Sequence, residues 1–346
     1  MSRPLVPEDL RRDLSTAREN TISSFVRSCI AVGMGKIDRV QPEAYARKTW
    51  PGDRNIVEVM RAATAPTTIA SSGPLAQVVA AMLPALVPVS AGADLLQRVL
   101  GLSFSGHAQI SIPSIGETIA DFVAEGAPIP VQQATTGAGV SLVPHKLSVT
   151  ITLTHEMMTS SNAEQMVRQV MIESTGPGID RNLFGSNAGD TVRPAGLLSG
   201  VAALPPASAG EKQQAMVDDL AALAAAVAPV SGNGQTAIVA APAQAIAIAL
   251  RAPRELDWPL LTSAGLAAGT VIAIATPVLV AAIEGAPQID ARREVAMHLD
   301  TAPLDVPAAR TISTFQTDSV ALRLRWPVTW ARRDARGVAF MTSVNW

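Results

Sequence analysis

The stretch from Lys146 to Thr154 places the tightest limit on how this chain folds. Apolar side chains stand at every second position, and lysine, serine or threonine stands between them. Strict alternation predicts a β-strand with one buried face and one exposed face. The apolar positions are Leu147, Val149, Ile151 and Leu153.

Directly after Thr154 the spacing of the apolar residues changes to that of a helix. The set is Met158, Met166, Val170 and Met171. This predicts a long helix whose methionines fill a core. We expect the helix to kink or end at Gly176, Pro177 and Gly178. A strand that leads straight into a long helix predicts a mixed α+β fold.

Upstream of the strand, the sequence predicts a long projecting hairpin. Residues 108–112 alternate weakly, and residues 125–144 contain too many prolines and glycines for a sheet interior. We therefore expect a long tip between two strands. Glu117, Asp121 and Glu125 lie on this arm and are interpreted as solvated or intersubunit charges.

The C-terminal half predicts a compact α+β unit followed by closing strands. We expect helices at 216–227 and from Pro242, buried strands at 236–241, 271–275 and 278–283, and a long strand from Ser319. Pro327 predicts that this last strand lies at an edge or bulges there. Residues 259–283 are long enough to span a bilayer, but internal glycine, threonine and proline favour two buried strands instead.

No pattern of catalytic or metal-binding chemistry stands out. Cys29 is the only cysteine and lies in an apolar helical stretch, which predicts an inert buried thiol. The four histidines lack the spacing of a shared metal site, and phosphate-binding and nucleophile motifs are missing. We expect no enzyme activity, no cofactor and no metal. The first twenty residues lack the apolar core of a signal peptide.

Composition favours a structural protein with extensive subunit contacts. Charged residues make up only 16% of the chain, against roughly 25% in an average soluble domain. The net charge of -2 predicts at most loose contact with DNA.

The order of these segments resembles the Hong Kong 97 type major capsid protein of tailed phages. The stretches that carry the resemblance are EGAPIPV, HKLSVTITLTHEMM, the helix ending IDRNLFG, and the final RWPVTWARRDARGVAFMTSVNW. It implies an α+β fold with an N-terminal arm, a long β-hairpin, a spine helix, and peripheral and axial domains. The expected ranges are a helical, scaffolding-like segment 1–62, arm 63–107, hairpin 108–153, spine and peripheral domain 154–212, axial domain 213–312 and closing strands 313–346.

The resemblance also implies a function and contact residues. It implies pentamers and hexamers that form an icosahedral shell around double-stranded phage DNA, assembled in the bacterial cytoplasm, with a portal and a scaffolding protein or prohead protease as partners and no membrane contact. The expected intersubunit residues of the hairpin loop are Phe122, Glu125, Pro128, Ile129, Pro130 and Val131. Those of the axial domain are Arg254, Asp257 and Trp258, and those of the closing strands are Arg323, Arg325, Trp326 and Trp330.

Two features depart from the family pattern: Gly176, Pro177 and Gly178 lie inside what is usually an uninterrupted spine helix, and the extended loop lacks a lysine. Two other functions stay open. Some relatives crosslink through a loop lysine, but no lysine lies between Gly116 and His145, so we expect no crosslink. Residues 1–62 resemble a removable scaffolding segment only in position and helical character. The first alternative is an encapsulin-like shell around an enzyme cargo. The second is a cytosolic enzyme without a recognisable motif.

Overall fold

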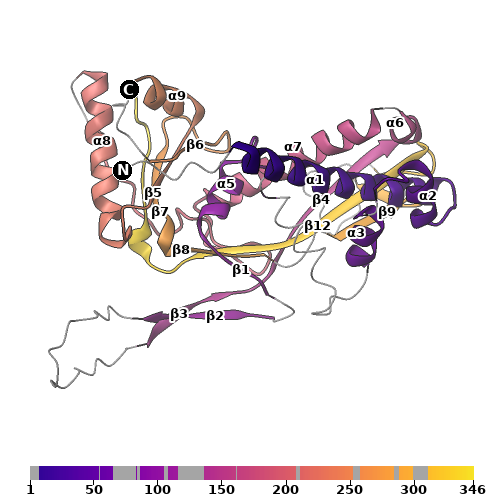
Figure 1. Ribbon diagram of the computed structural model, residues 1–346. Coiled ribbons are helices and arrows are strands. Elements are labelled where there is room, and N and C mark those ends of the chain that lie inside the picture. The colour runs from indigo at the N-terminus through magenta and orange to yellow at the C-terminus, as the bar shows by residue number, and fades with distance from the viewer. Residues whose placement is uncertain are drawn as a thin grey trace. The chain divides into compact units, whose positions relative to one another are not determined.

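The structure is a computed structural model of the chain (Figure 1). It describes residues 8–53, 55–64, 83, 86–104, 108–115, 136–160, 162–207, 211–251, 258–283, 288–298 and 311–346. The chain divides into two compact units. Unit 1 comprises residues 1–97, 146–181 and 284–327, and unit 2 comprises residues 98–145, 182–283 and 328–346. Within the described residues, helices and strands both contribute to each unit, which is the expected α+β class.

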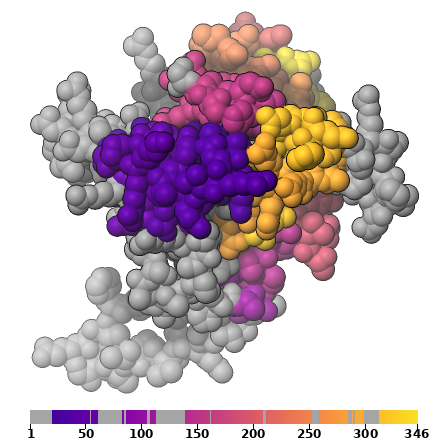
Figure 2. All heavy atoms as spheres, turned by 90° about the vertical axis from the view of Figure 1, so that its right-hand side faces the viewer, coloured from indigo at the N-terminus to yellow at the C-terminus, as the bar shows by residue number. Residues whose placement is uncertain are grey.

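Unit 1 begins with three helices that share a core. They are α1 (Glu8–Ile37), α2 (Pro42–Thr49) and α3 (Asn55–Thr64). Ala31, Ala46, Ile56 and Met60 form a buried cluster between them. In Figure 2 the surface of these N-terminal residues borders the orange surface of residues near 290, in agreement with the contacts of α1 and α3 with β9 (Gln288–Arg292). The helical nature of residues 8–62 is therefore confirmed over the described part.

The predicted strand is β4 (His145–Thr154), and it alternates as expected between exposed polar and more buried apolar side chains. It is followed by α6 (His155–Thr159) and α7 (Ala163–Leu183). The Thr154 hydroxyl accepts a hydrogen bond from the backbone N–H of Met157 and so caps α6. The change of period at Thr154 is thus confirmed as the switch from strand to helix.

The helix α7 does not end at its proline, so that part of the expectation is wrong. It runs through Pro177 to Leu183 because Ile179 and Leu183 are 1% and 0% exposed, and such packing outweighs the lost hydrogen bond. Gly176 has a separate reason to be glycine. A Cβ atom there would lie 2.9 Å from Val89 Cγ2, so the two segments approach too closely for a side chain.

The remaining described elements are α5 (Ala91–Arg98), β1 (Leu100–Leu102), β2 (Ile110–Ile115), β3 (Thr136–Leu142), α8 (Lys212–Val227), β5 (Thr236–Ala240), α9 (Pro242–Arg251), β6 (Leu260–Thr262), β7 (Val271–Ala275), β8 (Leu279–Ile283), β10 (Ala296–His298), β11 (Thr311–Ser313), β12 (Ser319–Arg332) and β13 (Val338–Met341). The expected helices at 216–227 and from Pro242 are therefore confirmed. So are the buried strands at 236–240, 271–275 and 279–283. Part of the expected arm, residues 91–98, is helix α5.

Unit 2 has a four-stranded sheet in the order β13-β7-β5-β6. Ile238, Ala273 and Ala339 stand in register on one face. They share a buried cluster with Leu223 of α8 and Ile248 of α9, so both helices cover that face. The strand β13 pairs with β7, so the last strand of the chain completes the sheet that carries α8 and α9.

The long strand β12 is an interior strand, which corrects the expectation of an edge. The sheet order is β1-β8-β12-β4, and β9 also pairs with β12. Pro327 is tolerated because it falls between two pairings. The β9 ladder ends at Arg325 and the β8 ladder begins at Val328. Pro327, which lacks a backbone N–H, is therefore not a paired residue of the β8 ladder or of the β9 ladder.

The hairpin also closes differently from the expectation. Residues 136–142, expected within the tip, form β3 and pair with β2. The strand β4 pairs with β12 in another sheet. Gly137 and Gly139 are tolerated in β3 because a strand of a two-stranded sheet makes few side-chain contacts, so the missing side chains cost little stability.

Candidate assembly surfaces

Within its described length, the hairpin of β2 and β3 is anchored at its root. At its root, Phe104, Leu142, Val280 and Ala282 form a buried cluster in unit 2. The register shifts between Ile112 and Ser114, as expected for a bulge at the intervening proline. Among the described residues, β2 and β3 pair only with each other. An isolated two-stranded ribbon is marginally stable in water, so this hairpin is suited to pair with or lie on another surface.

The sheet of unit 1 presents a charged exposed face. Asp290 on β9 stands opposite Arg323 on β12. Its carboxylate accepts hydrogen bonds from Arg323 Nη2 at 2.8 Å and Arg325 Nη2 at 3.0 Å. Partial burial acts to raise the pKa of Asp290, but the hydrogen bond and the charges of Arg325, Arg323 and Arg292 outweigh it and hold the pKa below its usual value. Asp290 is therefore a fixed negative charge that orders two arginines.

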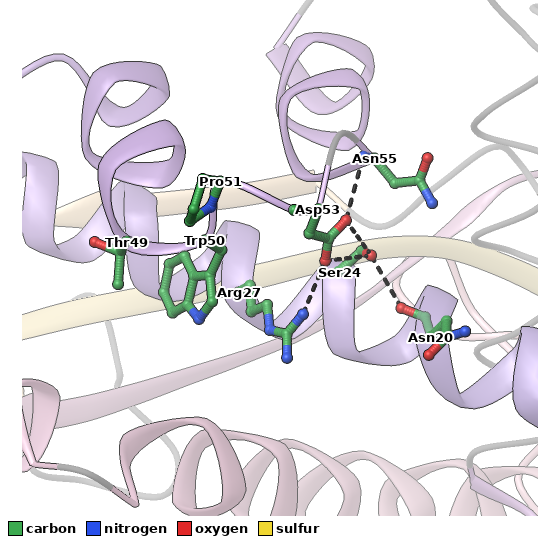
Figure 3. A pocket seen from close by; sticks show the side chains of 9 residues that line it. Asn20, Ser24, Arg27, Thr49, Trp50, Pro51, Asp53 and Asn55 are labelled. Atoms are coloured by element: carbon green, nitrogen blue, oxygen red, sulfur yellow. Dashed lines mark hydrogen bonds and ion pairs between the residues drawn. The ribbon is translucent and has the colours of Figure 1, made fainter.

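The N-terminal helices are joined to α7 by a bridging arginine. Arg27 Nε donates to Glu164 Oε2 at 2.9 Å, and Arg27 Nη1 donates to Asp53 Oδ2 at 3.0 Å. The Ser24 hydroxyl also lies within hydrogen-bonding distance of both Asp53 carboxylate oxygens. Ser24, Arg27 and Asp53 line an open hollow of about 650 Å³ together with Trp50 (Figure 3). Because Arg27 and Asp53 satisfy each other's charge, the contacts around this hollow hold the helices together.

Cys29 follows Arg27 by two residues on α1 and lies in the core of unit 1. It is 1% exposed, and its Sγ atom lies 3.9 Å from Met171 Sδ of α7. Burial raises the pKa of its thiol far above the ordinary value, although a backbone hydrogen bond acts in the opposite direction. The predicted burial of this thiol is confirmed.

Asp180 on α7 organises the start of α5. Its carboxylate accepts hydrogen bonds from Ser90 Oγ at 2.5 Å, from the Gly92 N–H at 2.9 Å and from the Ala91 N–H at 3.3 Å. Ser90 Oγ in turn accepts the Ala93 N–H. Because a carboxylate is stabilised at a helix N-terminus, Asp180 fixes α5 to the end of the long helix. This aspartate lies in the segment IDRNLFG that carries the family resemblance, but sequence reasoning missed its partner Ser90, which lies 90 positions earlier.

The structure describes only some of the expected contact residues. The six hairpin-loop residues, together with Arg254 and Asp257, lie outside the described residues. Trp258 is half-buried against the core of the four-stranded sheet. The four expected residues of the closing strands all lie on β12.

On β12, arginines and tryptophans play different parts. Arg323 and Arg325 reach the exposed face, whereas Trp326 and Trp330 are 0% and 6% exposed. The Trp330 Nε1–H donates to the carbonyl oxygen of Ala195 at 2.9 Å. The tryptophans therefore stabilise the subunit interior, and the arginines are the ones available to a partner. Sequence reasoning missed Asp290, because its position opposite Arg323 depends on the register between two strands that are 33 residues apart in sequence.

Within the described ranges, no group of three or more His, Cys, Asp or Glu side chains is placed to share a metal ion. His145 lies at the start of β4 and His155 at the start of α6, as predicted. No helix among the described residues is both long enough and apolar enough to cross a bilayer.

Comparisons with known proteins agree on one family. Residues 83–254 match the model of the phage capsid family. A capsid polyprotein of Pseudomonas phage PAJU2 is 24% identical over 93% of this chain, and the chain spans about half (54%) of that relative's length. Solved structures from Mycobacterium phage Bobi and Mycobacterium phage Adephagia share the fold, with TM-scores of 0.52 and 0.51 and identities of 13% and 15%. Each covers 73% of this chain and 90% of its own.

The expected fold of the Hong Kong 97 type is thereby confirmed. The matched model and the capsid polyprotein make this chain similar to the phage capsid family.

Proposed function

We propose that this chain is the major capsid protein of a tailed phage or prophage, and that its function is to build a closed shell through contacts with copies of itself. The observation that carries the proposal is the hairpin of β2 and β3. It is rooted in a buried cluster of unit 2, yet over its described length it gains no third strand. Identical subunits that clasp one another through such an element form rings and closed shells.

The finer parts of the proposal follow the family resemblance. The shell is icosahedral, is built from pentamers and hexamers, and encloses double-stranded DNA in the virion. We propose that unit 1 contains the peripheral domain and that α8, α9 and their sheet form the core of the axial domain. A portal protein and a scaffolding protein or prohead protease complete the assembly pathway, which takes place in the host cytoplasm.

An encapsulin-like shell is less well supported than a phage capsid. The matched family model and the curated relative both carry the name of phage capsids. We also propose that the chain has no catalytic role, since Asp180 caps a helix and Asp53 and Asp290 are held in ion pairs with arginines.

Expression of the chain, followed by size-exclusion chromatography and electron microscopy, tests the proposal. We expect capsomers or closed shells. The matched variant replaces residues 113–139 with a short Gly-Ser linker, which removes the projecting part of the hairpin but keeps Leu142 and the buried root cluster. That variant should fold and stay unassembled. A wild-type chain that remains monomeric at all salt and protein concentrations would contradict the proposal.

A further inference from the structure

The helix α1 is buried on more than one face. Ala31 lies in the cluster that α1 shares with α2 and α3. A second set of apolar side chains of α1 is buried outside that cluster and consists of Phe25, Val26, Cys29, Ile30 and Met34. A surface helix buries a single apolar stripe and exposes the opposite face. The helix α1 therefore lies between α2 and α3 on one side and the rest of unit 1 on the other.

One partner of this second set is the long helix α7. Cys29 Sγ lies 3.9 Å from Met171 Sδ, and Arg27 Nε donates to Glu164 Oε2 at 2.9 Å. The space left between the two helices is a gap of only about 30 Å³. Its lining is mainly apolar and includes Ile22, Phe25, Val26, Leu86, Met171 and Ile172. A gap of this size holds no more than about one water molecule, so α1 and α7 are in close apolar contact.

The other partners are α6 and the strands of the unit 1 sheet. A Cβ atom at Gly33 would lie 2.5 Å from Met158 Cε of α6 and 3.6 Å from Leu322 Cδ2 of β12. Glycine at this position therefore allows α1 to approach both elements closely. At the end of α1, Arg293 Nη1 donates to the carbonyl oxygen of Ile37 at 3.1 Å. A guanidinium is favourable at a helix C-terminus, so the last turn of α1 is held by the residue that follows β9.

Removal of α1 would uncover both of these surfaces. Met158, Met171 and Leu322 are at most 8% exposed with α1 in place. Their burial, and that of the facing side chains of α1, contributes to the free energy of unfolding in proportion to the apolar area removed from water. Because the net stability of a domain is a small difference between large terms, the loss of a whole packed helix is a severe perturbation. Unit 1 is therefore expected to need α1 in order to stay folded.

We propose that the helices α1, α2 and α3 are a permanent domain of the subunit and stay in the assembled shell. The resemblance implied a removable scaffolding segment at residues 1–62, and the burial of α1 argues against that removal. A scaffolding segment is one that leaves the shell, so any scaffold of this shell is a separate chain. The three helices precede residues 83–254, which match the capsid family model. The proposal rests on the proposed shell function only for the particle in which retention is measured.

A cut in the chain after α3 tests whether packing or only the peptide bond holds the three helices. The recognition sequence of a specific protease is inserted between Ser71 and Ser72, and the purified chain is cut there. Native size-exclusion chromatography should recover both pieces in a single peak, and the same column in urea should separate them. An N-terminal piece that leaves under native conditions would overturn the proposal. This experiment requires no shell.

Two matched variants of the cut chain locate the contact. Val26→Asp places a carboxylate in the apolar gap between α1 and α7, and it should lower the fraction of bound N-terminal piece about tenfold or more, because a buried unpaired charge is costly. Val40→Asp makes the same substitution where the side chain is 44% exposed, and it should retain the piece as the unsubstituted chain does. Circular dichroism before cleavage verifies that each chain folds. Equal retention in both variants would contradict the proposed contact.

Mass spectrometry of purified shells dissolved in denaturant is the second readout. We expect the peptides of α1, α2 and α3 in the same molar amount as peptides of α7, both in empty shells and in shells that contain DNA. Shells that form and lack those N-terminal peptides would overturn the retention and leave the proposed function intact. Failure of the chain to form any shell would instead contradict the proposed function, and the cut-chain experiment would still decide whether the helices are held by packing.

Discussion

Removing the Asp180 carboxylate is expected to break the hydrogen bonds that attach the start of α5 to α7, and so to destabilise unit 1. Asp180 is 2% exposed and accepts hydrogen bonds from Ser90 Oγ and from the backbone N–H groups of Ala91 and Gly92. Asp180→Ala leaves those buried donors without their acceptor, and Asp180→Asn keeps one acceptor oxygen but turns an NH₂ group towards the donors.

The size of the effect follows from those contacts. A hydrogen bond to a charged group contributes about 1.5–3 kcal/mol, and each stranded buried donor costs about 1–3 kcal/mol. The three bonds are not additive, because they share one carboxylate. We therefore expect Asp180→Ala to lower the free energy of unfolding by about 4 kcal/mol and Asp180→Asn by about 2 kcal/mol. Against a total of about 5–15 kcal/mol for a domain, the first loss is severe.

Urea unfolding of the unassembled subunit, followed by circular dichroism, measures these values. Asp218→Asn is the matched control because Asp218 is exposed on α8, and it should change stability by less than about 0.5 kcal/mol. Ser90→Ala, which removes the first donor, should cost about 1 kcal/mol alone and less in the Asp180→Ala background. A loss below about 1 kcal/mol for Asp180→Ala would refute the reasoning.

Three further predictions concern other parts of the fold. Trp346→Phe should lower the free energy of unfolding of unit 2 by about 1–3 kcal/mol in the same assay, because the Trp346 Nε1–H donates to the buried Asp219 carboxylate at 2.7 Å; an unchanged midpoint would contradict this. The stability difference between wild type and Asp290→Asn should be constant near neutral pH and shrink below about pH 4. The sign follows because the folded pKa is depressed, so the contribution is present above the unfolded value and is lost as pH falls through the folded one; a difference that grows in acid would contradict it. A thiol reagent should modify Cys29 about a thousandfold more slowly in the native protein than in urea, since the thiol is 1% exposed and its pKa is raised; equal rates would show that the core of α1 opens freely.

The sequence alone determined the elements whose side chains repeat with a clear period. The alternation of β4 and the helical spacing after Thr154 predicted both elements and the boundary between them. The buried strands β5, β7 and β8 and the helices α8 and α9 were likewise found from short apolar runs and from Pro242 at a helix start. These predictions hold because a period of two or of 3.6 residues is a local property of the backbone.

The candidate site was less accessible to sequence reasoning. The arginines of β12 stood out by alternation, which puts them on the opposite face from Trp326 and Trp330, and the structure places these two tryptophans inside. The acceptors that order the charged groups come from distant segments. Asp290 lies 33 and 35 positions before its two arginines, and Asp53 and Glu164 lie 26 and 137 positions after Arg27.

Only the tertiary structure decided which strands pair and which local rules give way. The local pattern predicted β4 as the return of the hairpin, whereas β3 closes it and β4 pairs with β12. Pro327 lies within an interior strand, between two partner strands. Pro177 lies inside a continuous helix because Ile179 and Leu183 are buried beyond it. In each case the outcome depends on backbone hydrogen bonds and apolar contacts between residues far apart in sequence, and the spacing of side chains within one segment does not encode these.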